Sequence, residues 1–214
     1  MNRGAMHLKH RPKHEDTTMN AVHITQGKGK MTGIQSINTP TTTNEFCLNM
    51  RKVKANAICK KCYAFRYESY RPSLVEALKR NLFLAERSLE IGEIPAIRDE
   101  IARFDSYGEL INLIHFVNYM YIAAANPQTI FTLWTKRLDI VQEALLTRSK
   151  PDNMILIYSS PVVDKQAVLP AGFDKVFTSY TKNTTTDINC HGSCNTCRLC
   201  YSHNDTVNIN EIIK

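Results

Sequence analysis

All seven cysteines of the chain fall into two groups, and their spacing is the strongest chemical signal in the sequence. The first group is Cys47, Cys59 and Cys62. The second lies in the eleven-residue stretch CHGSCNTCRLC and consists of Cys190, Cys194, Cys197 and Cys200. Disulfides between neighbours in so short a stretch would close small, strained loops. Thiolates two residues apart instead curve around one metal centre, so the sequence predicts metal binding.

The spacing within the second group favours an iron–sulfur cluster. Cys194, Cys197 and Cys200 form a C-x2-C-x2-C pattern, which holds three corners of a [4Fe–4S] cluster while a remote residue supplies the fourth ligand. That ligand is Cys190 or a thiol of the first group. Seven thiolates suffice for two clusters, one with four ligands and one with three, or for one cluster with the other thiols structural or bound to zinc. Zinc is the alternative metal, held by the paired hooks Cys59-x2-Cys62 and Cys197-x2-Cys200.

The elements that position these cysteines follow from hydrophobic periodicity. We expect strands at 31–40, 109–116, 129–135, 153–160 and 174–181, with a sixth hidden, and helices at 71–90, 95–104, 117–126 and 136–148. Strands that alternate with helices imply right-handed βαβ units and a mostly parallel sheet. The predicted fold class is therefore α/β, as a partial (β/α) barrel, with a doubly wound sheet as the alternative.

Loops that leave parallel strands emerge on one face, where sites are built. The first cysteine group follows the first predicted strand and the second follows the last, so we expect both cysteine-rich loops at the carboxyl-terminal face. Three basic residues also follow strands and are candidates to bind an anionic ligand there: Lys136, Arg137 and Lys182. Four others beside the cysteines could offset thiolate charge: Lys60, Lys61, Arg66 and Arg198. We interpret His115 and Trp134 as packing residues.

Composition and charge bound the remaining possibilities. Residues 1–30 are predicted to form a basic, flexible arm, and residues 31–214 a single α/β iron–sulfur domain. The net charge of +7 makes the arm either a solvated extension or an electrostatic tether to nucleic acid. No apolar run is long enough to span a bilayer and no apolar signal core is present. We therefore expect no membrane partner and a cytoplasmic protein, since cysteines in a reducing cytosol are more often metal ligands than disulfides.

Several motifs together resemble the phage-associated gene-product-88 family. They are ICKKCYA at 58–64, the helix ending in Arg80-Asn81, LWTKR at 133–137, MILIYSS at 154–160 and the closing C-x3-C-x2-C-x2-C-Tyr. The resemblance covers roughly residues 30–203. Members of that family are mostly encoded by phages and prophages, and their function is largely unassigned. The resemblance implies an iron–sulfur site on a barrel related to radical S-adenosylmethionine enzymes, in the cytoplasm of a host cell.

The sequence departs from radical S-adenosylmethionine enzymes at two points. Their cysteines are usually spaced CxxxCxxC, whereas eleven residues separate Cys47 from Cys59, and a Gly-Gly-Glu motif after the second strand is absent. We therefore do not expect cleavage of S-adenosylmethionine. Three functions remain: an iron–sulfur protein with a redox or radical-type role, a non-catalytic cluster sensor, carrier or host-interaction protein, and a zinc-stabilised nucleic-acid-binding protein.

Overall fold

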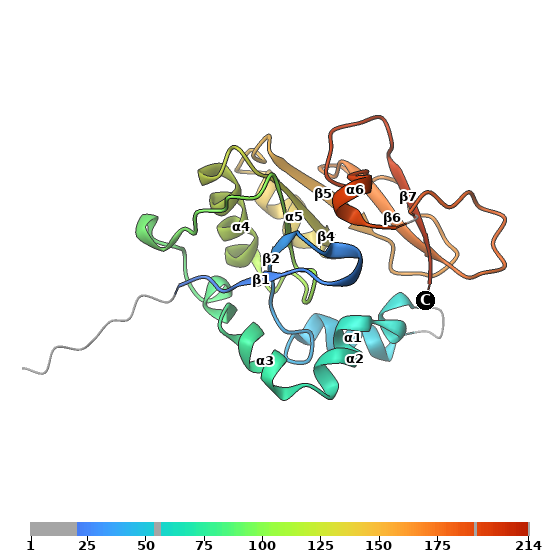
Figure 1. The fold of residues 1–214 in the computed structure, drawn as a ribbon, viewed down its shortest axis with the longest axis horizontal. Helices are drawn as coiled ribbons and strands as arrows, with labels where there is room; N and C mark the ends of the chain where they lie inside the picture. The colour runs from blue at the N-terminus through green and yellow to red at the C-terminus, as the bar shows by residue number, and fades with distance from the viewer. Residues whose placement is uncertain (1–20, 54–56, 191, 214) are drawn as a thin grey trace, which may run out of the picture.

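The computed structural model describes residues 21–53, 57–190 and 192–213, which form a seven-stranded sheet with helices packed against it (Figure 1). The strands are β1 (Ile24–Gln26), β2 (Gln35–Ile37), β3 (Ile101–Phe104), β4 (Ile130–Thr135), β5 (Met154–Ser159), β6 (Lys175–Tyr180) and β7 (Asn208–Ile212). They lie side by side in chain order, with β1 antiparallel to β2 and every later pair parallel. A doubly wound sheet would reverse its strand order at a switch point, so this order argues against that alternative.

The helices are short, and polar residues or proline define several of their starts. They are α1 (Glu45–Lys52), α2 (Tyr63–Ser69), α3 (Pro72–Lys79), α4 (Leu113–Ala125), α5 (Leu138–Leu145) and α6 (Cys194–Cys197), together with the 3-10 turns η1 (Gly29–Met31), η2 (Ile58–Lys61), η3 (Leu82–Ala85) and η4 (Ile91–Glu93). The side chain of Asn112 accepts a hydrogen bond from the His115 amide and so caps α4. Pro72 occupies the first turn of α3, as predicted.

Most of the predicted elements are confirmed, but the order of strand and helix between residues 95 and 125 is wrong. The predicted helix at 95–104 contains β3, and the predicted strand at 109–116 runs into α4. The spacing of Ile97, Ile101 and Phe104 fits one helical stripe, yet Ile101 and Phe104 belong to separate cores on opposite faces of the sheet. A four-residue strand buried on both faces gives no periodicity that distinguishes it from a helix.

The two faces of the sheet are covered in different ways. On the helix-covered face, Phe104, Leu133 and Leu156 pack with residues of α4 and α5 in the larger hydrophobic core. The opposite, cysteine-covered face carries an apolar set of strand and near-strand residues packed against the second cysteine group: Ile34, Ile101, Ile155, Ile157 and Ile209. Figure 1 shows α6 on this side, away from α4 and α5. One face is therefore closed by helices and the other by a loop that contains thiols.

The ordered fold begins before the predicted boundary at residue 30. Val22 is buried, and β1 pairs with β2. Residues 1–20 of the predicted arm lie outside the described residues. None of the helices in the described ranges has the length and apolar content needed to cross a membrane.

Candidate metal centres

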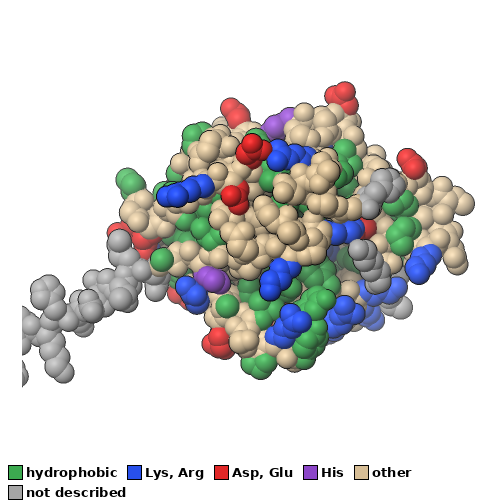
Figure 2. Space-filling view, viewed as in Figure 1, with side chains coloured by type: hydrophobic (Ala, Val, Ile, Leu, Met, Phe, Trp, Pro, Cys, Tyr) green, Lys and Arg blue, Asp and Glu red, His purple; other side chains and the backbone are tan. Residues whose placement is uncertain are grey.

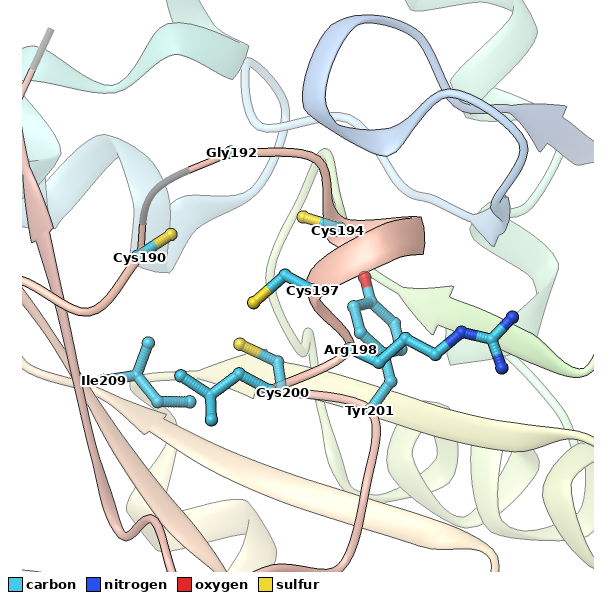
Figure 3. A pocket seen from close by; sticks show the side chains of 9 residues that line it. Cys190, Gly192, Cys194, Cys197, Arg198, Cys200, Tyr201 and Ile209 are labelled. Atoms are coloured by element: carbon cyan, nitrogen blue, oxygen red, sulfur yellow. The ribbon is translucent and has the colours of Figure 1, made fainter.

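The four cysteines of the second group line one recess, which we call the four-cysteine site. Figure 3 shows the sulfur atoms of Cys190, Cys194, Cys197 and Cys200 turned toward a common space. Leu199 and Ile209 contribute apolar walls. Cys200 is buried, whereas Cys197 is exposed. Four soft sulfur donors in an apolar surround are a chemically suitable set for an iron–sulfur cluster or for zinc.

Local backbone geometry brings these thiols together. The amide of Cys197 donates to the Ser193 carbonyl at 2.9 Å, which forms the single turn of α6. Arg198 then adopts a left-handed conformation, with φ of 52°, and reverses the chain so that Cys200 returns beneath α6. Cys190 is fixed separately, because its amide donates to the Asn210 carbonyl in β7 at 3.1 Å. A helix and a strand therefore hold the two ends of the ligand set.

A lysine from the other end of the chain supplies positive charge at this site. The ammonium group of Lys30 lies 3.8 Å from the sulfur of Cys190 and also pairs with Glu211. Arg198, which was predicted to offset thiolate charge, instead points away from the sulfurs and pairs with Glu100 at 2.7 Å (Figure 3). Burial raises the pKa of the Cys200 thiol, so without a metal this group is protonated. A bound metal would replace that proton.

The first cysteine group lines a different recess, which we call the three-cysteine site. Cys47, Cys59 and Cys62 share it with Phe46, Phe65, Arg51, Glu109 and Lys136. The Asn44 side chain accepts from the Cys47 amide and positions that residue in the first turn of α1. Arg51 donates to the Cys59 carbonyl at 3.1 Å, and its guanidinium stacks 3.7 Å from the Phe65 ring centre. The segment is anchored to the sheet by a 3.0 Å bond from the Ile58 amide to the Pro161 carbonyl.

An acidic and a basic side chain, Glu109 and Lys136, lie beside the three thiols. Glu109 accepts from the Lys136 amide at 3.0 Å and from the Thr135 hydroxyl, which fixes its carboxylate at the carboxyl end of β4. The Lys136 ammonium donates to the Ser159 hydroxyl at 3.0 Å. Burial alone would lower the pKa of Lys136, but the charges of Cys59 and Glu109 raise it above its ordinary value. Lys136 is therefore a cation held close to the thiols.

The two sites lie apart and share no lining residue. The three-cysteine site stands at the carboxyl edge of the sheet, as predicted. The four-cysteine site does not, because its loop turns back across the cysteine-covered face. Arg198 pairs with Glu100, just before β3, and Asn204 accepts from Lys175 at the start of β6, so the residues after Cys197 reach the amino ends of the strands. The prediction that both groups meet at one edge is wrong for the second group.

This separation also removes two of the predicted ligand arrangements. Cys59-x2-Cys62 and Cys197-x2-Cys200 line different recesses, so the two hooks do not surround one zinc ion. For the same reason, the first group does not supply the fourth ligand of the second. Among residues 21–53, 57–190 and 192–213, no three Cys, His, Asp or Glu side chains are arranged so that they could hold one metal ion. The assignment of thiols to two ligand sets rests on which of them share a recess.

The other predicted site residues lie in different places, and only Lys136 lines a cysteine site. Lys136 lines the three-cysteine site. Arg137 does not, because its guanidinium binds Asp139 and the carbonyls of Leu110 and Ile111. Lys182 is exposed in the loop after β6. His115 is a buried residue of α4, as predicted, and burial lowers its pKa to about 3, so it is neutral.

Three neighbours of the thiols were not predicted from the sequence. Lys30 was assigned to the arm, and Glu109 and Arg51 were not singled out. Lys30 and Glu109 reach the sites through tertiary contacts, so cysteine spacing contains no signal for them, whereas Arg51 lies one helical turn after Cys47 in α1. Trp134 is a packing residue, as predicted: it is half-buried against the smaller core on the cysteine-covered face, with the Arg103 guanidinium 3.9 Å from its ring centre.

Comparison with known protein families identifies a relationship. A family model described as "Gene product 88" matches residues 6–199. The matched range includes six of the seven cysteines and ends one residue before Cys200. No curated protein and no solved structure matches the chain.

Proposed function

This chain belongs to the gene product 88 family, and from that premise we propose that it is an iron–sulfur protein whose four-cysteine site binds a [4Fe–4S] cluster. One observation carries the proposal: four thiols from a single eleven-residue segment line one recess with apolar walls. Three of them have the C-x2-C-x2-C spacing typical of cluster ligands. Cys190, held against β7, supplies the fourth thiol that this spacing requires. The nearby Lys30 ammonium would offset part of the negative charge of the thiolates.

We propose that the three-cysteine site holds a second cluster. Cys47, Cys59 and Cys62 would bind three of its irons, and the fourth iron would have no cysteine ligand. A cluster with such an open corner supplies redox or Lewis-acid chemistry to a molecule bound there. Lys136 and Glu109 line the same recess, so the chain offers one cation and one carboxylate to orient that molecule. This arrangement supports a redox or radical-type role over a purely structural one.

We also propose that the sheet is a partial (β/α) barrel and that the described residues, β1 included, belong to a single domain. The strictly sequential, parallel order of β2 to β7 supports this, because a singly wound barrel places each strand beside the next in the chain. The loop of the four-cysteine site covers the face that would line the interior of such a barrel. The three-cysteine site at the carboxyl edge then occupies the usual place of a barrel active site.

Metal analysis after oxygen-free purification tests the proposal. We expect about eight iron and eight sulfide per chain if both sites hold [4Fe–4S] clusters, about four of each if only the four-cysteine site does, and a brown protein in either case. Stoichiometric zinc without sulfide would overturn the proposal. Incubating the reduced protein with S-adenosylmethionine then tests for a radical-type enzyme, because such an enzyme cleaves it, whereas a redox protein, a sensor or a carrier does not. The departures from the radical-enzyme cysteine spacing predict no cleavage.

A further inference from the structure

Four tyrosines gather on one face of the molecule, beside but outside the three-cysteine site. Tyr63 and Tyr67 belong to α2, Tyr70 ends it, and Tyr107 lies in the loop after β3. The ring centres of Tyr63 and Tyr107 are 5.7 Å apart, and those of Tyr67 and Tyr70 are 5.8 Å apart. Tyr63 is 47% exposed and Tyr70 is 56% exposed. Large aromatic side chains left this open to solvent call for an explanation, since burial is their usual state.

Arginines cover the same rings. The Arg71 guanidinium lies 4.9 Å from the Tyr67 ring centre and 5.3 Å from that of Tyr70. Arg66 lies 5.5 Å from the Tyr67 ring centre. These cation–π contacts hold the guanidinium groups beside the exposed rings. We call the surface formed by Tyr63, Tyr67, Tyr70, Arg66 and Arg71 the tyrosine–arginine face.

The charge around this face is strongly positive and largely unpaired. Residues 45–80 contain nine Lys or Arg and three Glu. One of those acids, Glu68, is buried, and its two carboxylate oxygens accept hydrogen bonds from the amides and hydroxyls of Thr41 and Thr42. Within the described part of this segment, only Lys79 forms an ion pair with a carboxylate. Arg66, Arg71 and their basic neighbours therefore keep their charge available to a partner.

The space-filling view shows how these side chains share the surface. In Figure 2, Lys and Arg alternate with hydrophobic surface, which in that colouring includes Tyr, over the lower right, where Figure 1 places α1 and α2. Few acidic side chains interrupt this region of the view. Positive charge alternating with exposed rings is the composition of surfaces that bind single-stranded nucleic acid, where arginines contact phosphates and rings stack on bases.

We propose that the tyrosine–arginine face binds single-stranded nucleic acid. A duplex would use the charge but not the rings, because its bases are already stacked. A single strand uses both. The face adjoins the three-cysteine site, since Tyr63 directly follows Cys62 and Phe65 lines that recess. A strand bound here would lie beside the thiols. The proposal stands without any assumption about what the thiols bind.

Fluorescence anisotropy of labelled DNA and RNA 20-mers with the full chain tests this proposal and separates the two sources of single strand. Tyr70→Ala should weaken binding by about 5- to 150-fold, the range expected for one stacked base, whereas Tyr70→Phe keeps the ring and should bind as wild type does. Arg71→Gln should lower the slope of log affinity against log salt by about 0.7, the value for one lost phosphate contact on a single strand. Tyr121→Ala, in α4 and 43% exposed, is the matched control and should bind normally.

Three results would overturn the proposal. One is equal binding of an abasic strand of the same length, which would mean that bases are not stacked. Another is an equal loss of affinity in Tyr70→Ala and Tyr121→Ala. The third is a particle of twice the 24.4 kDa chain mass that becomes a monomer in Tyr70→Ala without any oligonucleotide, which would assign the face to a second copy of the chain. Circular dichroism melts of each variant identify any that lost affinity by unfolding.

Discussion

Replacing Cys197 by serine separates the two proposed clusters most directly. Cys197 is exposed, so serine creates no cavity and buries no hydroxyl. Because the two sites share no lining residue, the variant should lose the iron of the four-cysteine site and keep that of the three-cysteine site. Iron should therefore fall from about eight to about four per chain if both sites hold a [4Fe–4S] cluster, or from about four to near zero if only one does.

The structure also gives the local stability that should remain after this loss. The four residues of α6 are too few to be stable as an isolated helix. The ion pair of Arg198 with Glu100 is half-exposed to exposed and contributes about 0–1 kcal/mol. Burial of the Tyr201 ring, 3% exposed, contributes about 2–3 kcal/mol by analogy with other large side chains. Without a cluster these two contributions together amount to about 2–4 kcal/mol, so residues 194–201 should open with about 30- to 900-fold protection.

Hydrogen exchange measured by mass spectrometry on peptides from 194–201 and from β5 gives this number, with iron assayed on the same samples. We expect loss of protection in 194–201 and little change in β5. Arg198→Gln is the control, because its side chain neighbours Cys197 but points away from the thiols, and it should keep its iron. Full iron content in Cys197→Ser, or unchanged protection of 194–201, would refute the assignment of the four-cysteine site. Loss of all iron from both sites would refute their independence.

Three further predictions concern the fold. Asp105 accepts from the Thr39 and Tyr119 hydroxyls at 3.1 Å, and burial raises the pKa of its carboxyl well above its usual value. The folded protein keeps this proton while the unfolded chain releases it above about pH 4, so stability should fall with rising pH by up to about 1.4 kcal/mol per unit. Asp105→Asn should lose that slope. If urea unfolding gives the same difference in free energy between the variant and wild type at pH 4 and at pH 7, the raised pKa of Asp105 is contradicted. Phe104→Ala, at a fully buried ring stacked 4.1 Å from that of Tyr119, should cost about 3–5 kcal/mol in urea unfolding; a cost below 1 kcal/mol would be inconsistent with this packing. Gly108→Ala should lower the melting temperature, because φ is +102° and the added carbon would lie 2.4 Å from the Thr39 hydroxyl; an unchanged melt would count against that contact.

Much of the sheet could be predicted from the sequence, for identifiable reasons. β4 and β5 are buried on both faces, so each appears as an apolar run of strand length, and the turn residues around them define their ends. β1 and β7 could not be predicted in this way. Both are short and largely polar, with sequences ITQ and NINEI, and pairing with a neighbouring strand, rather than a hydrophobic pattern, makes them strands. β3 fails differently, because its four residues fit a helical pattern equally well.

The metal sites show a similar division between local and distant information. The second cysteine group is contained within one turn and one loop, so sequence spacing alone identifies it. Its location could not be predicted, because the path of the loop depends on the apolar residues that it covers. The tyrosine–arginine face could be predicted from the sequence, since Tyr63, Tyr67 and Tyr70 recur at helical spacing. The aromatic residues that alternate with basic ones lie in residues 63–71, outside the basic arm at residues 1–30.

The difference between the two hydrophobic cores indicates how the proposed clusters divide their roles. The larger core, on the helix-covered face, contains no cysteine, whereas the smaller core includes Cys200, with Cys190 and Cys194 packed against it. A cluster at the four-cysteine site would therefore stabilise the loop that covers an otherwise open sheet face. Among the described residues, no cysteine of the three-cysteine site belongs to either core, and a cation and a carboxylate lie beside its thiols. Loss of the first cluster should therefore affect stability before chemistry, and loss of the second should affect chemistry while the fold persists.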